Sequence, residues 1–205
     1  INTPLIAAKL VNSQSEQAAR IVKGRIEKTY LGDVASVIEE AWAGSYTYLG
    51  VHVDMDAIQK LQLEVTLDDI RRAILAIPRL KIRDERVTVL PHKNSIRIYV
   101  YPDEKEKDVY YTMKHLKRIL PHVVIKGIPN GTRAVISDEK GERKLLVEGY
   151  GLKEVMTTEG VVGTETQTNH VMEMQQVLGI EAARSSIYRE IDYTMASHVM
   201  SIDPR

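Results

Sequence analysis

The stretch RVTVLPHKNSIRIYVY, residues 86–101, contains two short runs of alternating apolar residues on either side of Pro91-His92-Lys93-Asn94. Proline and asparagine are turn-forming residues, so this pattern predicts an antiparallel hairpin. Residues 46–53 also alternate, with Tyr46, Tyr48 and His52 on one face and apolar residues on the other. This alternation predicts a half-buried strand ahead of the hairpin.

Helical patterns surround these strands. Thr66 is an N-cap residue before apolar residues at helical spacing that end at Pro78, and a second such pattern covers 109–120. Ser13 and Glu16 match a capping box, which predicts a helix as far as about Tyr30. The C-terminal part predicts two helices, 169–178 and 180–198, separated at Gly179. Residues 31–42 are ambiguous, and we favour a strand.

A second hairpin is predicted from residues 133–137 and 144–148, and a short helix from 152–157. Strands and helices are interspersed without regular strand-helix-strand alternation. The sequence therefore predicts an α+β fold.

The composition is that of an ordinary globular protein. The 205 residues are 43% hydrophobic and 27% charged, with 28 basic and 28 acidic side chains and no cysteine. A neutral balance is untypical of a dedicated nucleic-acid module, and the lack of cysteine excludes disulfides and thiolate chemistry. The longest aliphatic run, 73–77, is far shorter than a membrane helix, so no membrane partner is expected. The start at Ile1, without Met or a signal-peptide pattern, leads us to expect a fragment of a longer polypeptide.

The sequence offers no visible catalytic constellation. Its six histidines lack a compact ligand spacing, so no metal site is expected. Gly149-Tyr150-Gly151 lacks the third glycine of a dinucleotide loop, and no nucleophile elbow is present. We therefore expect no catalytic, cofactor-binding or metal-binding residue here. Lys23, Arg25 and Lys28 are candidates for contact with nucleic-acid phosphates, although a solvated helix face is the competing interpretation.

Several long motifs resemble one protein family. TNHVME at 168–173 and VLGIEAAR at 177–184 resemble a motif of the largest subunit of multi-subunit RNA polymerases. ARIVKGRIEKT at 19–29, LLVEGYGL at 145–152 and MSIDPR at 200–205 look most like the largest subunit of eukaryotic DNA-directed RNA polymerase III. The similarity is collinear over essentially the whole chain.

The resemblance implies a domain organisation and partners. Residues 1–43 and 129–205 would form a discontinuous cleft unit, and 44–128 an inserted jaw, in the region after the trigger loop. The 133–148 hairpin would pair with the strand at 31–41. Implied partners are the other polymerase III subunits, among them a small zinc-ribbon subunit at the jaw and the shared subunit that grips downstream DNA, together with downstream duplex DNA.

The resemblance also implies a non-catalytic segment of a nuclear nucleotidyltransferase that makes small RNAs such as tRNA and 5S rRNA. Mg and Zn are expected only elsewhere in the complete polymerase. The sequence departs from the family pattern at Glu165 and Gln167, where Arg and Thr are expected, and at Val199, where Gly is usual. The alternatives are an independent α+β protein-interaction module and, less favoured because catalytic residues are missing, a small soluble enzyme.

Overall fold

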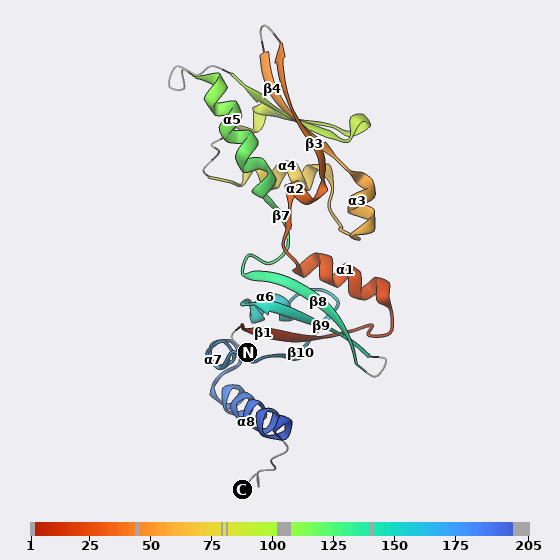
Figure 1. The fold of residues 1–205 in the computed structure, drawn as a ribbon, viewed down its shortest axis with the longest axis vertical. Coiled ribbons are helices and arrows are strands. Elements are labelled where there is room, and N and C mark those ends of the chain that lie inside the picture. Colours follow the sequence, from red (N-terminus) through yellow and green to blue (C-terminus); the bar gives the residue numbers. More distant parts are fainter. Residues whose placement is uncertain are drawn as a thin grey trace. The chain divides into compact units, whose positions relative to one another are not determined.

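The structure is a computed structural model that describes residues 3–43, 46–78, 80, 82–101, 108–139 and 142–198 (Figure 1). The chain divides into two compact units, which we call unit 1 and unit 2. Unit 1 consists of Ile1–Glu27 and Ile128–Arg205, and unit 2 of Lys28–Gly127. Val199 and the MSIDPR motif lie outside the described residues.

Unit 1 contains a four-stranded antiparallel sheet in the order β10-β1-β9-β8. Its strands are β1 (Leu5–Leu10), β8 (Gly131–Glu139), β9 (Glu142–Gly149) and β10 (Val161–Thr168). Ala7 of β1 pairs with Leu146 of β9 on one side and with Gln167 of β10 on the other. The N-terminal strand therefore joins the two parts of this discontinuous unit.

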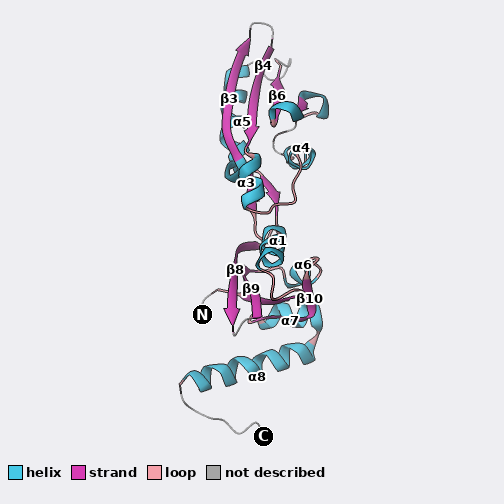
Figure 2. Cartoon of the chain, turned by 90° about the vertical axis from the view of Figure 1, so that its right-hand side faces the viewer, coloured by secondary structure: helices cyan, strands magenta, loops and turns pink. Residues whose placement is uncertain are grey.

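Four helices complete unit 1: α1 (Glu16–Ile26), α6 (Leu152–Met156), α7 (Val171–Leu178) and α8 (Ile180–Ser197). Buried side chains of α1 share one hydrophobic core with the sheet and with α6, including Ile6, Val22, Ile26, Leu145 and Leu152. Figure 2 shows α8 as one unbroken helix next to α7 in the chain.

Unit 2 contains a second four-stranded antiparallel sheet, in the order β3-β4-β6-β5. Its strands are β3 (Ala35–Ala43), β4 (Tyr46–Val53), β5 (Val87–Leu90) and β6 (Ser95–Val100). Helices α4 (Leu67–Leu75) and α5 (Val109–Ile119) contribute Ile70, Ile74 and Met113 to its core. Leu49 and Ile98, from the central strands, are fully buried in the same core.

Shorter elements connect these layers of unit 2. They are β2 (Thr29–Tyr30), which pairs with β7 (Val124–Lys126), α2 (Leu31–Val34), α3 (Met55–Lys60), and the 3-10 turns η1 (Asp84–Arg86), η2 (Pro91–Lys93) and η3 (Leu120–His122).

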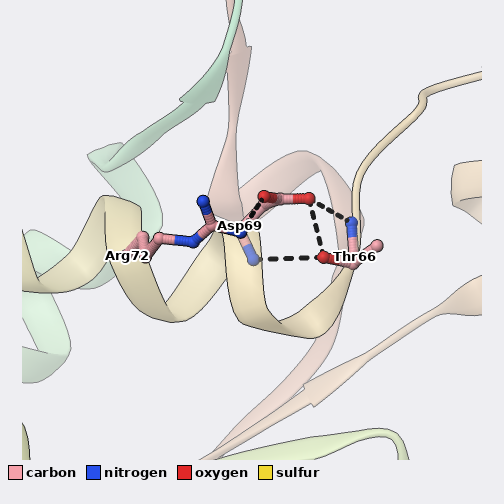
Figure 3. A network of polar contacts seen from close by, with 3 residues as sticks. All are labelled: Thr66, Asp69 and Arg72. Atoms are coloured by element: carbon pink, nitrogen blue, oxygen red, sulfur yellow. Dashed lines mark hydrogen bonds and ion pairs between the residues drawn. The ribbon is translucent and has the colours of Figure 1, made fainter.

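The start of α4 is fixed by a capping box (Figure 3). The Thr66 hydroxyl accepts from the Asp69 amide at 3.3 Å, and the Asp69 carboxylate accepts from the Thr66 amide at 2.9 Å and from its hydroxyl. These hydrogen bonds, and secondarily the charge of Arg72 at 2.9 Å, hold the pKa of Asp69 below its ordinary value. The cap at Thr66 predicted from the sequence is thus confirmed.

Most predicted elements are confirmed, and the fold is α+β, as predicted. Three local predictions are wrong. The N-cap of α1 is Ser15, whose hydroxyl accepts from Ala18, and not Ser13. This helix ends at Ile26, because residues 29–30 form β2. Residues 31–34 are the short helix α2, so that strand β3 begins only at residue 35.

The predicted pairing of the 133–148 hairpin with residues 31–41 is also wrong. β3 pairs with β4, whereas the hairpin of β8 and β9 pairs with β1. Because β3 is bound to β4 along its whole length, residues 28–43 belong to unit 2, while the predicted first boundary followed residue 43. The assignment of the segments 1–43, 44–128 and 129–205 to cleft and jaw stays a prediction.

Candidate functional site

Two of the three basic residues predicted from the sequence to face nucleic acid, Lys23 and Arg25, are engaged with acidic groups. Lys23 lies one helical turn before Glu27, with Nζ 3.4 Å from its carboxylate. Arg25 donates to the carbonyl oxygen of Glu159 at 2.9 Å and lies 3.4 Å from the Glu159 carboxylate. Their charge is thus partly compensated within unit 1. Lys28, the third candidate, is half-buried and belongs to unit 2.

A cluster of four tyrosines occupies one face of the unit 2 sheet, and we call it the tyrosine face. Tyr46 and Tyr48 come from β4, and Tyr99 and Tyr101 from β6 and the residue after it. Side chains two residues apart point to the same side of a strand. Because Tyr48 pairs directly with Tyr99 in register, the two pairs of tyrosines meet.

The rings of the tyrosine face contact one another in a row. Ring centroids are 6.3 Å apart for Tyr46 and Tyr48, 5.7 Å for Tyr48 and Tyr99, and 6.2 Å for Tyr99 and Tyr101. Tyr46 is 47% exposed and Tyr101 is 45% exposed, while the two middle rings are half-buried. The result is a pre-organised aromatic surface that solvent reaches.

Charged side chains border this surface. The Arg97 guanidinium lies over the Tyr48 ring, 4.7 Å from its centroid. A hydrogen bond with the Tyr99 side chain raises the pKa of Arg97 above its ordinary value, so its positive charge is firmly held. On the same side, His52 Nε2 lies 3.2 Å from the Glu39 carboxylate. The tyrosine face thus offers aromatic area, one cation and one carboxylate.

Helix α5 packs on the opposite face of the sheet, and one carboxylate of β3 forms ion pairs with this helix. Glu40 of β3 lies 3.0 Å from Nζ of both Lys114 and Lys117. Hydrogen bonds from Lys117 and then Lys114 lower the pKa of Glu40 below its ordinary value. Tyr110 of α5 stacks on Trp42 with ring centroids 6.1 Å apart. These two lysines therefore fasten a helix to the sheet.

Side chains of the TNHVME motif form hydrogen bonds with backbone groups in several segments of unit 1. The Asn169 side-chain oxygen accepts from the Leu5 amide at 2.8 Å, and His170 Nδ1 accepts from the Glu173 amide as the N-cap of α7. Glu173 Oε1 in turn accepts from the amides of Gly151 and Leu152 at 2.7 and 2.8 Å. Each polar side chain here satisfies backbone groups at a strand or helix end, so the motif has a structural role.

Two departures from the family pattern also have local explanations. Glu165 of β10 pairs with Lys9 of β1 at 2.7 Å, and this hydrogen bond raises the pKa of Lys9. The Gln167 side chain accepts a hydrogen bond from Arg189 of α8. Both residues thus have partners in unit 1.

The described part of the chain contains no group of three or more His, Asp or Glu placed to hold a metal ion. Within the same residues, no helix is long and apolar enough to span a bilayer.

Comparison with known proteins identifies the class of this α+β chain. Residues 1–205 match the family described as RNA polymerase Rpb1, domain 5. The chain belongs to this family.

Its curated relatives point to one branch. The chain is 53% identical to DNA-directed RNA polymerase III subunit rpc1 of Schizosaccharomyces pombe, 49% identical to subunit RPC1 of Saccharomyces cerevisiae and 43% identical to subunit RPC1 of Homo sapiens. Each match covers 100% of this chain, and the chain spans about 15% of the length of each relative. The predicted resemblance to a fragment of the polymerase III largest subunit is confirmed.

Proposed function

We propose that the chain is the jaw and cleft portion of the largest subunit of RNA polymerase III. In this proposal it carries no catalytic residue of its own. It supports downstream duplex DNA and docks smaller subunits in the nucleus, while the complete polymerase makes small RNAs such as tRNA and 5S rRNA. The match of the whole chain to one polymerase III subunit supports this proposal.

The tyrosine face is the observation that carries the docking role. Tyrosine and arginine are enriched among residues that dominate binding energy at protein interfaces, and tyrosine buries a large area while only two side-chain torsions are fixed. Here four tyrosines and Arg97 lie on a rigid sheet, and pairwise ring contacts fix their orientation. In the proposal this face binds a smaller polymerase subunit, and the small zinc-ribbon subunit is the occupant that the family resemblance favours. The shared subunit that grips downstream DNA is a further proposed neighbour.

The contribution to DNA support is electrostatic and modest in this proposal. Lys23 and Arg25 are each paired with a carboxylate at the surface. Surface ion pairs are worth less than about 1 kcal/mol, so exchange of the Glu27 carboxylate for a phosphate costs Lys23 little. Arg25 is only 22% exposed and must also release the Glu159 carbonyl oxygen. Lys23, Arg25 and Lys28 remain the proposed DNA-facing residues.

The docking role is tested in the complete subunit, assembled into polymerase. Tyr48→Ser and Tyr99→Ser remove the two central rings of the tyrosine face. Truncation of one interface hot spot costs about 2 kcal/mol, which is about thirtyfold in affinity. We expect the zinc-ribbon subunit to be lost from the purified polymerase in a salt wash that the parent complex withstands.

Tyr111→Ser is the matched control, because Tyr111 is 70% exposed on α5 and does not belong to the tyrosine face. Retention of the zinc-ribbon subunit by both face variants, at the level of this control, would contradict docking through the tyrosine face. Limited proteolysis of the assembled polymerase checks that unit 2 of each variant is folded, because an unfolded unit would be cleaved faster than in the parent complex.

A further inference from the structure

An apolar groove runs between α7 and α8 of unit 1. It encloses about 350 Å³ and is lined by Val171 of α7 and by Ile180, Ala183, Ile187 and Tyr188 of α8. The side chains of Ile180, Ile187 and Tyr188 are 66%, 44% and 61% exposed. Monomeric soluble proteins rarely expose a contiguous group of large apolar side chains, and such a group often marks a binding site. The groove therefore resembles a binding surface.

Helix α8, which provides most of the groove lining, has few buried side chains. Over its described residues, α8 buries only Ala183 and Ser186. Ser186 donates to the Thr168 carbonyl oxygen at 3.3 Å, which anchors the first half of the helix to β10. Ile191, one turn after Ile187, is 48% exposed and extends the apolar stripe. Helices in proteins gain most of their stability from packing an apolar face, whereas the described residues leave this stripe of α8 about half exposed.

The groove also carries a charge that a partner can complement. Arg184 lines it, with its guanidinium 5.7 Å from the centroid of the Tyr188 ring. Its acidic neighbour, Glu181, lies 3.9 Å away, and both side chains are more than half exposed. A surface ion pair of this length contributes little, so Arg184 can bind another carboxylate.

We propose that this groove binds an amphipathic helix supplied by the same polypeptide, from a part outside residues 1–205. That helix presents aliphatic residues at i, i+3 or i+4 spacing to the groove and one carboxylate to Arg184. The inference rests on the proposed function, in which the chain is part of a long subunit. The chain spans about 15% of the length of its curated relatives, so most of such a polypeptide lies outside it. Linkage in one polypeptide raises the effective concentration of a segment far above that of a second copy.

Photo-crosslinking in the assembled polymerase tests this occupant. A photoreactive phenylalanine analogue replaces Ile187 in the complete subunit, and cross-linked peptides are identified by mass spectrometry. We expect a crosslink from position 187 to a segment of the same subunit that lies outside residues 1–205, with no increase in the mass of that subunit. A crosslink to a different subunit, to a second copy, or only to α7 and other parts of residues 1–205 would overturn the proposal.

Two controls sharpen the result. The same probe at Ser185, which is exposed about 160° around α8 from Ile187, reports background. A crosslinking yield at position 187 no higher than at position 185 also overturns the proposal.

Arg184→Glu should lower the crosslinking yield at position 187 by about tenfold, because it places a like charge against the partner carboxylate. Arg20 is an exposed arginine on α1, and Arg20→Glu should leave the yield at position 187 unchanged. An unchanged yield with Arg184→Glu would contradict the proposed contact between Arg184 and a partner carboxylate. If the proposed function itself fails, the subunit is recovered without polymerase III subunits, which is a different outcome from a misdirected crosslink.

Discussion

Replacement of Glu173 by alanine should destabilise unit 1 and leave unit 2 unchanged. One oxygen of this carboxylate accepts both amides that open α6, at 2.7 and 2.8 Å. Hydrogen bonds to a charged group contribute about 1.5–3 kcal/mol each. Glu173 is half-buried and its other oxygen is buried without a partner in the described residues, so the lower limit applies. We expect a loss of about 3 kcal/mol.

Urea denaturation measures this loss in each unit separately. With a slope of about 1.5 kcal/mol per M, a 3 kcal/mol loss lowers the midpoint by about 2 M. Far-ultraviolet circular dichroism follows both units, whereas fluorescence excited at 295 nm follows only Trp42 in unit 2. We expect the dichroism transition of unit 1 to move and the Trp42 transition to stay.

Two matched variants decide whether the cap is responsible. Glu173→Gln keeps an acceptor oxygen without the charge, so its loss should be about half that of alanine. Glu181→Ala removes an exposed carboxylate from α8 and should change stability by less than about 0.5 kcal/mol. The reasoning is refuted if Glu173→Ala shifts the unit 1 midpoint no more than Glu181→Ala does.

Three further predictions concern backbone strain, pH and salt. Gly149→Ala should lower the free energy of unfolding of unit 1 by about 1–3 kcal/mol, because φ is +120° and a Cβ would lie 2.5 Å from the Asn130 carbonyl oxygen. Urea denaturation should show a lower midpoint for unit 1, and an unchanged midpoint would contradict this strain. Two lysines lower the pKa of Glu40, so protonation of this carboxylate is less favourable in the folded chain than in the unfolded chain. The urea midpoint of unit 2, followed by Trp42 fluorescence, should therefore fall as the pH drops from the ordinary value of 4.5 through the lowered pKa. Glu40→Gln should flatten this fall, and an identical pH profile would argue against the ion pairs. In the assembled polymerase, Lys23→Gln should reduce the slope of log affinity for duplex DNA against log salt by about 0.9, and an unchanged slope would remove Lys23 from the DNA-facing residues.

Local chemistry explains which elements could be predicted from the sequence. The hairpin at 86–101 and the helix after Thr66 depend on turn residues, alternation and an N-cap within a few residues. β1 and β10 were not predicted, because their pairing joins Ala7 to Gln167, far apart in the chain. β10 is also rich in polar residues, so it lacks the apolar alternation that indicates a strand.

Only part of the tyrosine face could be predicted from local sequence patterns. Alternation places Tyr46 and Tyr48 on one face of their strand, and Tyr99 and Tyr101 also lie two residues apart. The register that sets Tyr48 against Tyr99 joins strands about fifty residues apart, and no local pattern determines it. The basic residues of α1 illustrate the reverse case, because a helix pattern shows positive charge but not the Glu159 group that binds Arg25.

Native capture tests the central claim most directly. An antibody raised against an exposed segment of this chain captures the protein from cells that express it, and mass spectrometry identifies the captured polypeptide and its partners. The account predicts a polypeptide several times longer than 205 residues, recovered together with RNA polymerase III subunits. A short polypeptide recovered without polymerase subunits would contradict it and would support an independent α+β interaction module instead.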